Sequence, residues 1–165
     1  MRSMVIRNNV VLTLMLFLVA CGYHLRGSLE IPKQLKNVYV QGASGTLYNE
    51  LKAAVKSAES RIVSTPKQAD IVINILSDKM RRRALSISSG GKANEFELDY
   101  SLKYTLSDAE GKTLLKPQNM EIHRSYFNQQ LNVLGKNNEE QVIRREMYRQ
   151  AVRSIFSQAR AVLKK

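Results

Sequence analysis

Residues 94–107 alternate between apolar and polar side chains with a period of two, and no other segment constrains the fold as strongly. Such alternation over a long stretch is typical of a β-strand that buries one face and exposes the other to water. The pattern predicts a half-buried antiparallel strand whose apolar face must be covered by another layer. That face carries Phe96, Leu98, Tyr100, Leu102, Tyr104 and Leu106.

The remaining periodicities predict three further strands and two helices. Apolar residues recur at helical spacing after Thr46, which can cap the helix, as far as Ile62, and again along residues 139–165. The nearly continuous apolar run at residues 71–76 favours a strand covered on both faces. The resulting order is β-α-β-β-β-α, with strands at 37–41, 70–87, 94–107 and 120–129 and turns at 88–91 and 108–112.

This order predicts an α+β fold in a single domain. The first helix can connect two parallel strands as a crossover, and the later strands then form an antiparallel meander. The economical arrangement is a four-stranded mixed sheet with both helices packed on one face.

The N-terminal segment has the three parts of a secretion signal. Residues 1–9 carry two arginines and no acid, and residues 10–19 are almost wholly apolar. That apolar stretch is too short to span a bilayer, which needs about 20 residues. The small Ala20 then precedes a cysteine. The segment therefore predicts a signal peptide that is cleaved after residues 1–20.

The tetrapeptide LVAC at residues 18–21 resembles the bacterial lipobox, in which the cysteine is lipidated and becomes the new N-terminus. Several acyl chains hold a protein on a membrane far better than one. We therefore expect a lipid anchor at Cys21, an irregular tether over residues 21–36 and a folded domain over residues 37–165. The alternative is a buried hydrophobic helix with a chance cysteine. Gly22, where an Asp would signal retention in the inner membrane, favours the outer membrane.

Cys21 is the only cysteine, so the lipidated chain would have no disulfide or free thiol and would depend on an ordinary core. Removing the signal takes away two arginines and no acid, and the net charge falls from +12 to +10. A secreted basic protein meets few nucleic acids. Its expected polyanionic partners are lipid headgroups, phosphorylated glycolipids or an acidic protein.

The sequence offers little catalytic chemistry. The two histidines, His24 and His123, form no His-Glu-x-x-His pattern, and the one cysteine is the expected lipid anchor. The patterns of a serine nucleophile elbow and of a phosphate loop are absent from the sequence. Glu95, Glu97 and Asp99 share a strand face, which can bind a cation or simply face water. We therefore expect no enzyme activity, no cofactor and no metal site.

Two basic clusters are better candidates for a binding site. Arg81, Arg82 and Arg83 lie on the strand before the first turn, and Lys92 follows that turn. Lys136 lies in a polar segment that we expect to form a loop just before the last helix. Cations at loop tips bind phosphate through charge-assisted hydrogen bonds. Charges on exposed strands also prevent edge-to-edge association, so both interpretations remain open.

Four segments resemble the LptE family of lipopolysaccharide-assembly lipoproteins. Cys-Gly-Tyr-His-Leu-Arg-Gly at residues 21–27 is similar to the start of the mature family members. Ala-Asn-Glu-Phe at 93–96 and Arg-Ser-Tyr-Phe at 124–127 are similar to two family strands. Residues 136–148, which contain Lys-Asn-Asn-Glu-Glu and Arg-Glu-Met-Tyr, are similar to the family's last loop and helix. Together these segments span most of the chain after the signal.

The resemblance implies a function that composition does not. LptE proteins bind lipopolysaccharide and plug the β-barrel of LptD, and the two together insert lipopolysaccharide into the outer leaflet. This chain is then expected to be an outer-membrane lipoprotein. Its expected partners are an LptD-like barrel, lipopolysaccharide and the membrane lipid that surrounds the acylated Cys21. The alternative is a stand-alone, periplasm-facing lipoprotein that serves as a scaffold for another envelope assembly.

The same resemblance bears on the basic clusters. Lys136 matches the family pattern. Some relatives carry a basic residue at the hairpin tip, where this chain has Ser88 and Ser89. Lys92 or the three arginines at 81–83 are the residues that can supply that charge instead.

Overall fold

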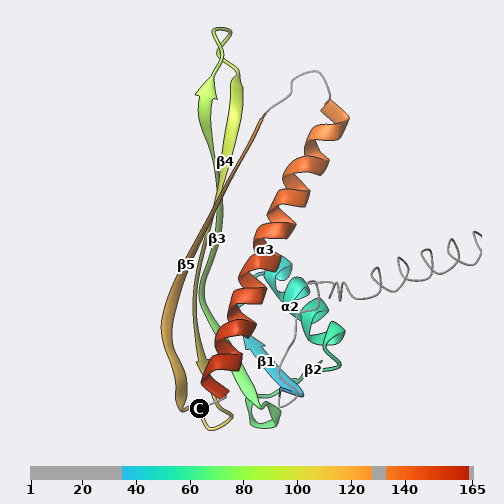
Figure 1. The fold of residues 1–165 in the computed structure, drawn as a ribbon, viewed down its shortest axis with the longest axis vertical. Coiled ribbons are helices and arrows are strands. Elements are labelled where there is room, and N and C mark those ends of the chain that lie inside the picture. The colour runs from blue at the N-terminus through green and yellow to red at the C-terminus, as the bar shows by residue number, and fades with distance from the viewer. Residues whose placement is uncertain (1–34, 128–132, 164–165) are drawn as a thin grey trace, which may run out of the picture.

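The structure, a computed structural model, describes residues 35–127 and 133–163 (Figure 1). The signal peptide, Cys21 and the tether up to residue 34 lie outside the described residues. The elements, in chain order, are β1 (Asn37–Gln41), α2 (Gly45–Ser57), β2 (Arg61–Ile62), the 3-10 helix η1 (Pro66–Gln68), β3 (Ile71–Ile87), β4 (Ala93–Ser107), β5 (Thr113–Phe127) and α3 (Val133–Leu163).

The strands form one mixed sheet in the order β2-β1-β3-β4-β5, and both helices lie on the same side of it (Figure 1). β1 pairs in parallel with β2 and β3, whereas β3, β4 and β5 form an antiparallel meander. The predicted α+β fold, with its crossover helix between parallel strands, is confirmed. The sheet has five strands among the described residues and not the four predicted, because β2 was missed.

β2 was not predicted because its apolar residue fits the helical spacing of the segment before it. Ile62 continues the helical spacing of the segment, yet α2 ends at Ser57 and Glu59 turns the chain with a φ of 56°. Ile62 then pairs with Val38 in the sheet. The start of α2 also differs from the prediction, because the capping residue is Ser44, whose Oγ accepts a hydrogen bond from the backbone N–H of Leu47 at 3.3 Å.

The core lies between β4 and α3, where the predicted alternation is confirmed. The inward residues of β4 from Leu98 to Leu106 are at most 1% exposed. They pack beneath two stripes of α3, of which only the first was predicted. Burying one such large apolar side chain stabilises a fold by roughly 1.5–3 kcal/mol. The first stripe holds Met147, Ala151, Ile155 and Ala159, and the second holds Tyr148, Val152 and Phe156.

β3 contains a bulge, and beyond it the side chains that faced one side of the sheet are replaced by those of the other parity. Ile75 pairs with Tyr104 and Ser77 pairs with Lys103, so Leu76 is an extra residue with no partner of its own. The predicted covering of both faces is wrong at Leu76, which is 53% exposed. Before the bulge the odd-numbered residues face the helices, and after it the even-numbered residues do as far as Ala84, where a second register shift follows.

β5 begins at Thr113 rather than at residue 120. The early part was missed because Pro117 lacks a backbone donor and argues against a strand. β5 is an edge strand, and residues 116 and 117 together oppose the single Thr105, since Tyr104 pairs with Gln118 and Leu106 with Leu115. A bulge on a sheet edge accommodates a proline because no ladder hydrogen bond is lost there.

α3 is longer at its start than predicted. It begins at Val133, so Lys136 lies within its first turns and not in a loop before them. Gly, Lys and Asn at 135–138 suggested a loop, but helix propensity is a weak prior that a continuing helix can override. The helix ends at Leu163, and the last two residues lie outside the described part. No helix in the described part of the chain is both long and apolar enough to cross a membrane.

Gly42 follows β1 and lies against the backbone of β3 next to the bulge, and its substitution tests this close approach. Its φ is +77°, and a Cβ atom there would lie 2.4 Å from the backbone oxygen of Ile75. We expect Gly42→Ala to lower the free energy of unfolding by about 2 kcal/mol or more, because it combines a left-handed conformation with a clash against backbone. Chemical denaturation measures the change. Gly45→Ala is the matched control, since nothing lies within 4 Å of that position.

Candidate functional site

The β3–β4 hairpin extends beyond the N-terminal end of α3 and forms one end of the molecule (Figure 1). Its turn is closed by two hydrogen bonds between Ser88 and Lys92. The Ser88 N–H donates to the Lys92 oxygen at 2.8 Å, and the Ser88 Oγ accepts from the Lys92 N–H at 3.3 Å. Gly91 supplies the positive φ of +74° that the turn requires. Ser88 therefore shapes the tip, and the exposed Lys92 is the cation beside it.

The bulge at Leu76 turns Arg82 toward the helices. Its Nη1 lies 3.0 Å from Oε2 of Glu140 on α3, and its guanidinium lies 4.7 Å from the ring centre of Phe96. Glu140 also accepts hydrogen bonds from Tyr126 of β5 and from Arg144, whose Nη2 is 2.6 Å away. This group of residues 82, 126, 140 and 144, the Glu140 cluster, ties three elements together.

Burial alone would raise the pKa of Glu140. Hydrogen bonds to the carboxylate from Tyr126, Arg144 and Arg82 outweigh burial, and the pKa lies below its usual value. Burial, together with the nearby carboxylate, raises the pKa of Tyr126 to about 12. The cluster is therefore an ionised carboxylate that three donors hold in place.

Arg83 points to the opposite, uncovered face of the sheet. It forms ion pairs with Glu97 and with Asp99, the latter at 3.3 Å from its Nε. Asp99 also lies 2.7 Å from Nδ1 of His123, and this hydrogen bond lowers the pKa of Asp99 and raises that of His123. Glu97, Asp99 and His123 are close enough together to share an ion. In the structure, the cation that both carboxylates contact is the guanidinium of Arg83.

The predicted hairpin cations therefore divide into two pairs. Arg82 and Arg83 are neutralised by carboxylates on opposite faces of the sheet. Arg81 and Lys92 are exposed, and neither forms an ion pair with any described residue. The side chain of Lys136 lies outside the described part of the structure, as does Cys21.

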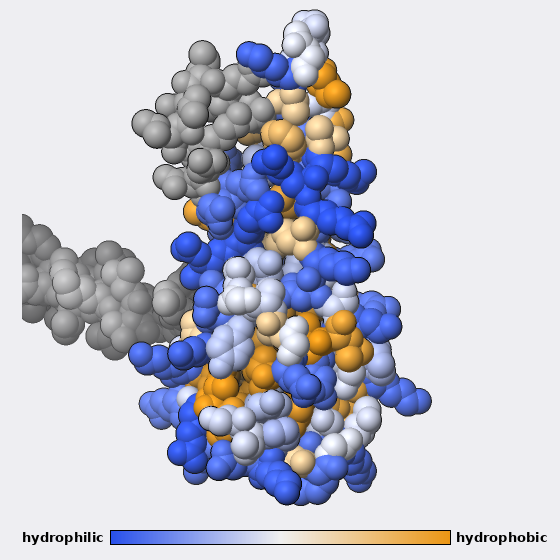
Figure 2. All heavy atoms as spheres, turned by 180° about the vertical axis from the view of Figure 1, so that it is seen from behind, coloured by the Kyte–Doolittle hydropathy of each residue, from blue (hydrophilic) through white to orange (hydrophobic). Residues whose placement is uncertain are grey.

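Exposed apolar side chains accompany the unpaired cations, a feature that sequence reasoning missed. Leu85 and Ile87 at the end of β3 are 42% and 68% exposed, and Phe127 at the end of β5 is 69% exposed. Figure 2 shows apolar side chains just below the hairpin tip and hydrophilic ones in a belt beneath them. The signal was the apolar spacing of Leu85 and Ile87 beyond the predicted core. The hairpin end thus combines positive charge with apolar surface.

Comparison with known proteins gives the family. The sequence model of one family, described as LptE: Lipopolysaccharide-assembly, matches residues 35–159 of this chain. The chain belongs to the LptE family. The match covers β1 through most of α3 and confirms the resemblance noted in the sequence.

Named relatives agree with this assignment. The chain is 28% identical over 144 residues to the LPS-assembly lipoprotein LptE of Pectobacterium atrosepticum, covering 85% of this chain and 77% of that protein. It is 26% identical over 155 residues to the protein of the same name from Photorhabdus laumondii, covering 90% and 84%.

Solved structures share the fold. The solution structure of lipoprotein B from Nitrosomonas europaea superposes with a TM-score of 0.69 at 27% identity, covering 87% of this chain and 93% of that one. The rare lipoprotein B from Shewanella oneidensis gives a TM-score of 0.59 at 21% identity, covering 78% and 96%. The second comparison supports the fold alone.

Membership in the LptE family assigns the chain a general role in lipopolysaccharide assembly and confirms that it is not an enzyme. For an LptE-family protein, the useful property of the hairpin end is binding and not catalysis. Most of its carboxylates and two of its arginines pair with one another. The groups left for a ligand are unpaired cations and exposed apolar side chains.

The Glu140 cluster predicts an acid-sensitive step in the unfolding of this LptE-family protein. Because its folded-state pKa is lowered, Glu140 adds stability that is present above its unfolded pKa and is lost as the pH falls through the folded value. We expect Glu140→Gln to destabilise the fold near pH 7 by about 1–3 kcal/mol, and to flatten the loss of stability below about pH 4.5.

Denaturant unfolding at several pH values measures both effects. Glu139→Gln is the control, because Glu139 is the exposed neighbour on the same helix. Equal pH dependence in the two variants would contradict the assigned role of Glu140.

Proposed function

We propose that this chain binds lipopolysaccharide at the hairpin end. The observation that carries the proposal is the combination of two unpaired cations, Arg81 and Lys92, with the exposed Leu85 and Ile87 on the same end of the hairpin. Lipopolysaccharide is amphiphilic, because it carries phosphates and acyl chains. Cations match the phosphates through charge-assisted hydrogen bonds, and apolar side chains match the acyl chains.

The paired arginines have a different task in this proposal. Arg82 and Arg83 would each have to leave a carboxylate before binding a phosphate, and the carboxylate would then lose its partner. The carboxylates are the shielded partners, since the side chains of Glu140 and Glu97 are only 17% and 18% exposed, and an unpaired carboxylate in such a place is costly. The two arginines therefore hold the hairpin on α3 and on β4, while Arg81 and Lys92 contact the ligand. Lys136 is a further proposed contact, from the start of α3.

We also propose that the chain is an outer-membrane lipoprotein, anchored through acylated Cys21, that occupies the lumen of an LptD-like barrel and stabilises it. Two features support this proposal. The domain is elongated, since the 17 residues of β3 rise about 56 Å at 3.3 Å per residue. The uncovered sheet face carries Arg83, Glu97, Asp99 and His123, and such a polar face suits the polar interior of a transmembrane barrel.

The double variant Arg81→Asp/Lys92→Asp tests the ligand site. We expect it to weaken binding of purified lipopolysaccharide by about tenfold or more. Hydrogen bonds to charged groups contribute roughly 1.5–3 kcal/mol when partly shielded, and 1.4 kcal/mol is one decade of affinity. Binding should also weaken with added salt, because exposed charges are screened. Capture of the full chain by immobilised lipopolysaccharide measures the affinity.

The control is Lys79→Asp/Lys103→Asp, which makes the same charge change at two exposed lysines of the same strands. It should bind as the parent chain does, and circular dichroism should show both variants folded. Equal loss in the two variants would mean that net charge, and not the hairpin end, governs binding. Lys136→Asp, made alone, reports on the third cation in the same assay.

Site-specific photocrosslinking tests the barrel partner. A crosslinker at Ser89, on the hairpin tip, should capture an outer-membrane barrel protein in living cells, as should one at Lys136. The same probe at Lys67 in η1, near the opposite end of β3, distinguishes a barrel that encloses only the hairpin from one that holds the whole domain. Capture of soluble periplasmic proteins alone, from all positions, would favour a stand-alone scaffold.

A further inference from the structure

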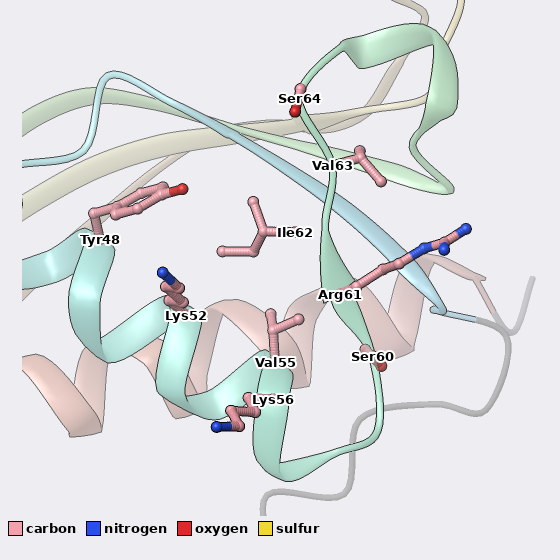
Figure 3. Close-up of a pocket in the computed structure, with 9 residues that line it drawn as sticks. All are labelled: Tyr48, Lys52, Val55, Lys56, Ser60, Arg61, Ile62, Val63 and Ser64. Atoms are coloured by element: carbon pink, nitrogen blue, oxygen red, sulfur yellow. The ribbon is translucent and has the colours of Figure 1, made fainter.

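A basic groove lies between α2 and the short strand β2 (Figure 3), two elements that lie far from the tip of the β3–β4 hairpin (Figure 1). Its volume is about 390 Å³. One wall is the outward face of α2, and the other is β2 with the two residues that follow it. We call it the α2–β2 groove. It is lined by Tyr48, Lys52, Val55, Lys56, Ser60, Arg61, Ile62, Val63 and Ser64.

The charge of the groove is entirely positive. Lys52, Lys56 and Arg61 are its charged lining residues, and all three are exposed. Arg61 donates from Nε to the neutral Oδ1 of Asn37 at 2.7 Å, and none of the three cations forms an ion pair with a described carboxylate. Lysines four residues apart on a helix repel each other. A bound anion would relieve that repulsion.

The uncharged lining residues indicate which chemical class of anion fits the groove. Val55 is buried at the base of the groove, and the half-buried Ile62 and Val63 add apolar surface. Tyr48 and Ser64 bring hydroxyl groups into the lining. Figure 3 shows Ile62 between the two walls, with Lys52 and Lys56 on the α2 side. Cations and hydroxyls next to apolar surface fit a phosphodiester that is attached to hydrocarbon.

The groove lies next to the N-terminal residues of the folded domain, and this position indicates the source of such a ligand. Ser60 donates from Oγ to the Leu35 oxygen at 2.6 Å, and the Arg61 N–H donates to the Lys36 oxygen at 2.9 Å. The groove therefore adjoins the first residues of the folded domain. Leu35 follows Cys21 by 14 positions, a length of chain that spans at most about 50 Å.

We infer that the α2–β2 groove binds the headgroup of an anionic phospholipid, such as phosphatidylglycerol, from the leaflet that holds the lipid anchor. The identity of that leaflet rests on the proposed anchor at Cys21. A tether of this length keeps the groove close to the membrane, so the effective concentration of headgroups is high. An acidic protein segment has the same charge, and the lipid is favoured because its hydrocarbon also matches the apolar Ile62 and Val63 of the lining.

Headgroup binding would orient the domain on the membrane. The anchor alone allows many orientations, because 14 residues can span at most nearly the length of β3. With the α2–β2 groove held against headgroups, β3 would run away from that leaflet and carry the hairpin end to the far side of the molecule (Figure 1). The two basic regions would then contact different anionic lipids at opposite ends of the fold.

Native mass spectrometry of the full chain, purified from membranes in a non-ionic detergent, tests the inference. We expect phosphatidylglycerol to bind at least tenfold more tightly than phosphatidylcholine. Lys52→Gln/Lys56→Gln/Arg61→Gln should reduce phosphatidylglycerol binding to the phosphatidylcholine level. The matched control Lys79→Gln/Lys103→Gln/Lys112→Gln, at three exposed lysines outside the groove, should bind as the parent chain does. Lys52→Gln/Lys56→Gln leaves the Arg61–Asn37 hydrogen bond intact, and it should show most of the loss even if the triple variant unfolds.

Four results would overturn the inference. The two lipids could bind equally, or the groove and control variants could lose the same affinity. Glycerol phosphate could bind as well as phosphatidylglycerol, which would indicate a free phosphate site. A hexaglutamate peptide could displace the lipid at a lower concentration, which would indicate a protein partner. The intact mass in the same spectra reports whether Cys21 is acylated, so failure of the anchor is distinguishable from failure of the groove.

Discussion

The burial of one face of β4 beneath α3 is the contact on which the rest of the structure depends. The inward side chains from Leu98 to Leu106 are almost completely shielded, and two stripes of α3 fill the space above them. Because both helices lie on that side, the other face of the sheet meets solvent or a partner and is correspondingly polar (Figure 1). The strands also run farther than the helices can cover. The uncovered hairpin end is a consequence of that difference in length.

Polar contacts then fix where the helices sit on this apolar layer. Asp78 of β3 accepts a hydrogen bond from the backbone N–H of Ser44 at 3.0 Å, just before α2 begins. Glu140 of α3 gathers Arg82 and Tyr126 from two strands. Apolar packing tolerates small sliding, whereas hydrogen bonds of this kind specify one register. One of these hydrogen bonds engages Arg82, which sequence reasoning placed in the candidate binding site.

Much of the fold could be predicted because strong local patterns coincided with the final packing. The alternation along β4 and the turn at 88–91 are properties of neighbouring residues, and both are found as predicted. The failures have one cause in common. β2 has only two residues, the start of β5 contains Pro117, and the start of α3 contains Gly135. In each case the local preference is weak or contrary, and pairing or packing with a distant segment decides the outcome.

The sequence by itself determined the one-sided sheet, the excess of positive charge and the family. Each of these follows from residue type and spacing, which do not change on folding. Only the tertiary structure decided which cations of the hairpin remain open. The extra residue at Leu76 shifts the alternation of β3 by one, and so sends Arg82 to the helices and Arg81 and Arg83 to the other face. The three arginines are equivalent as sequence, and they differ in the structure because a bulge exists only relative to the strand that pairs with it.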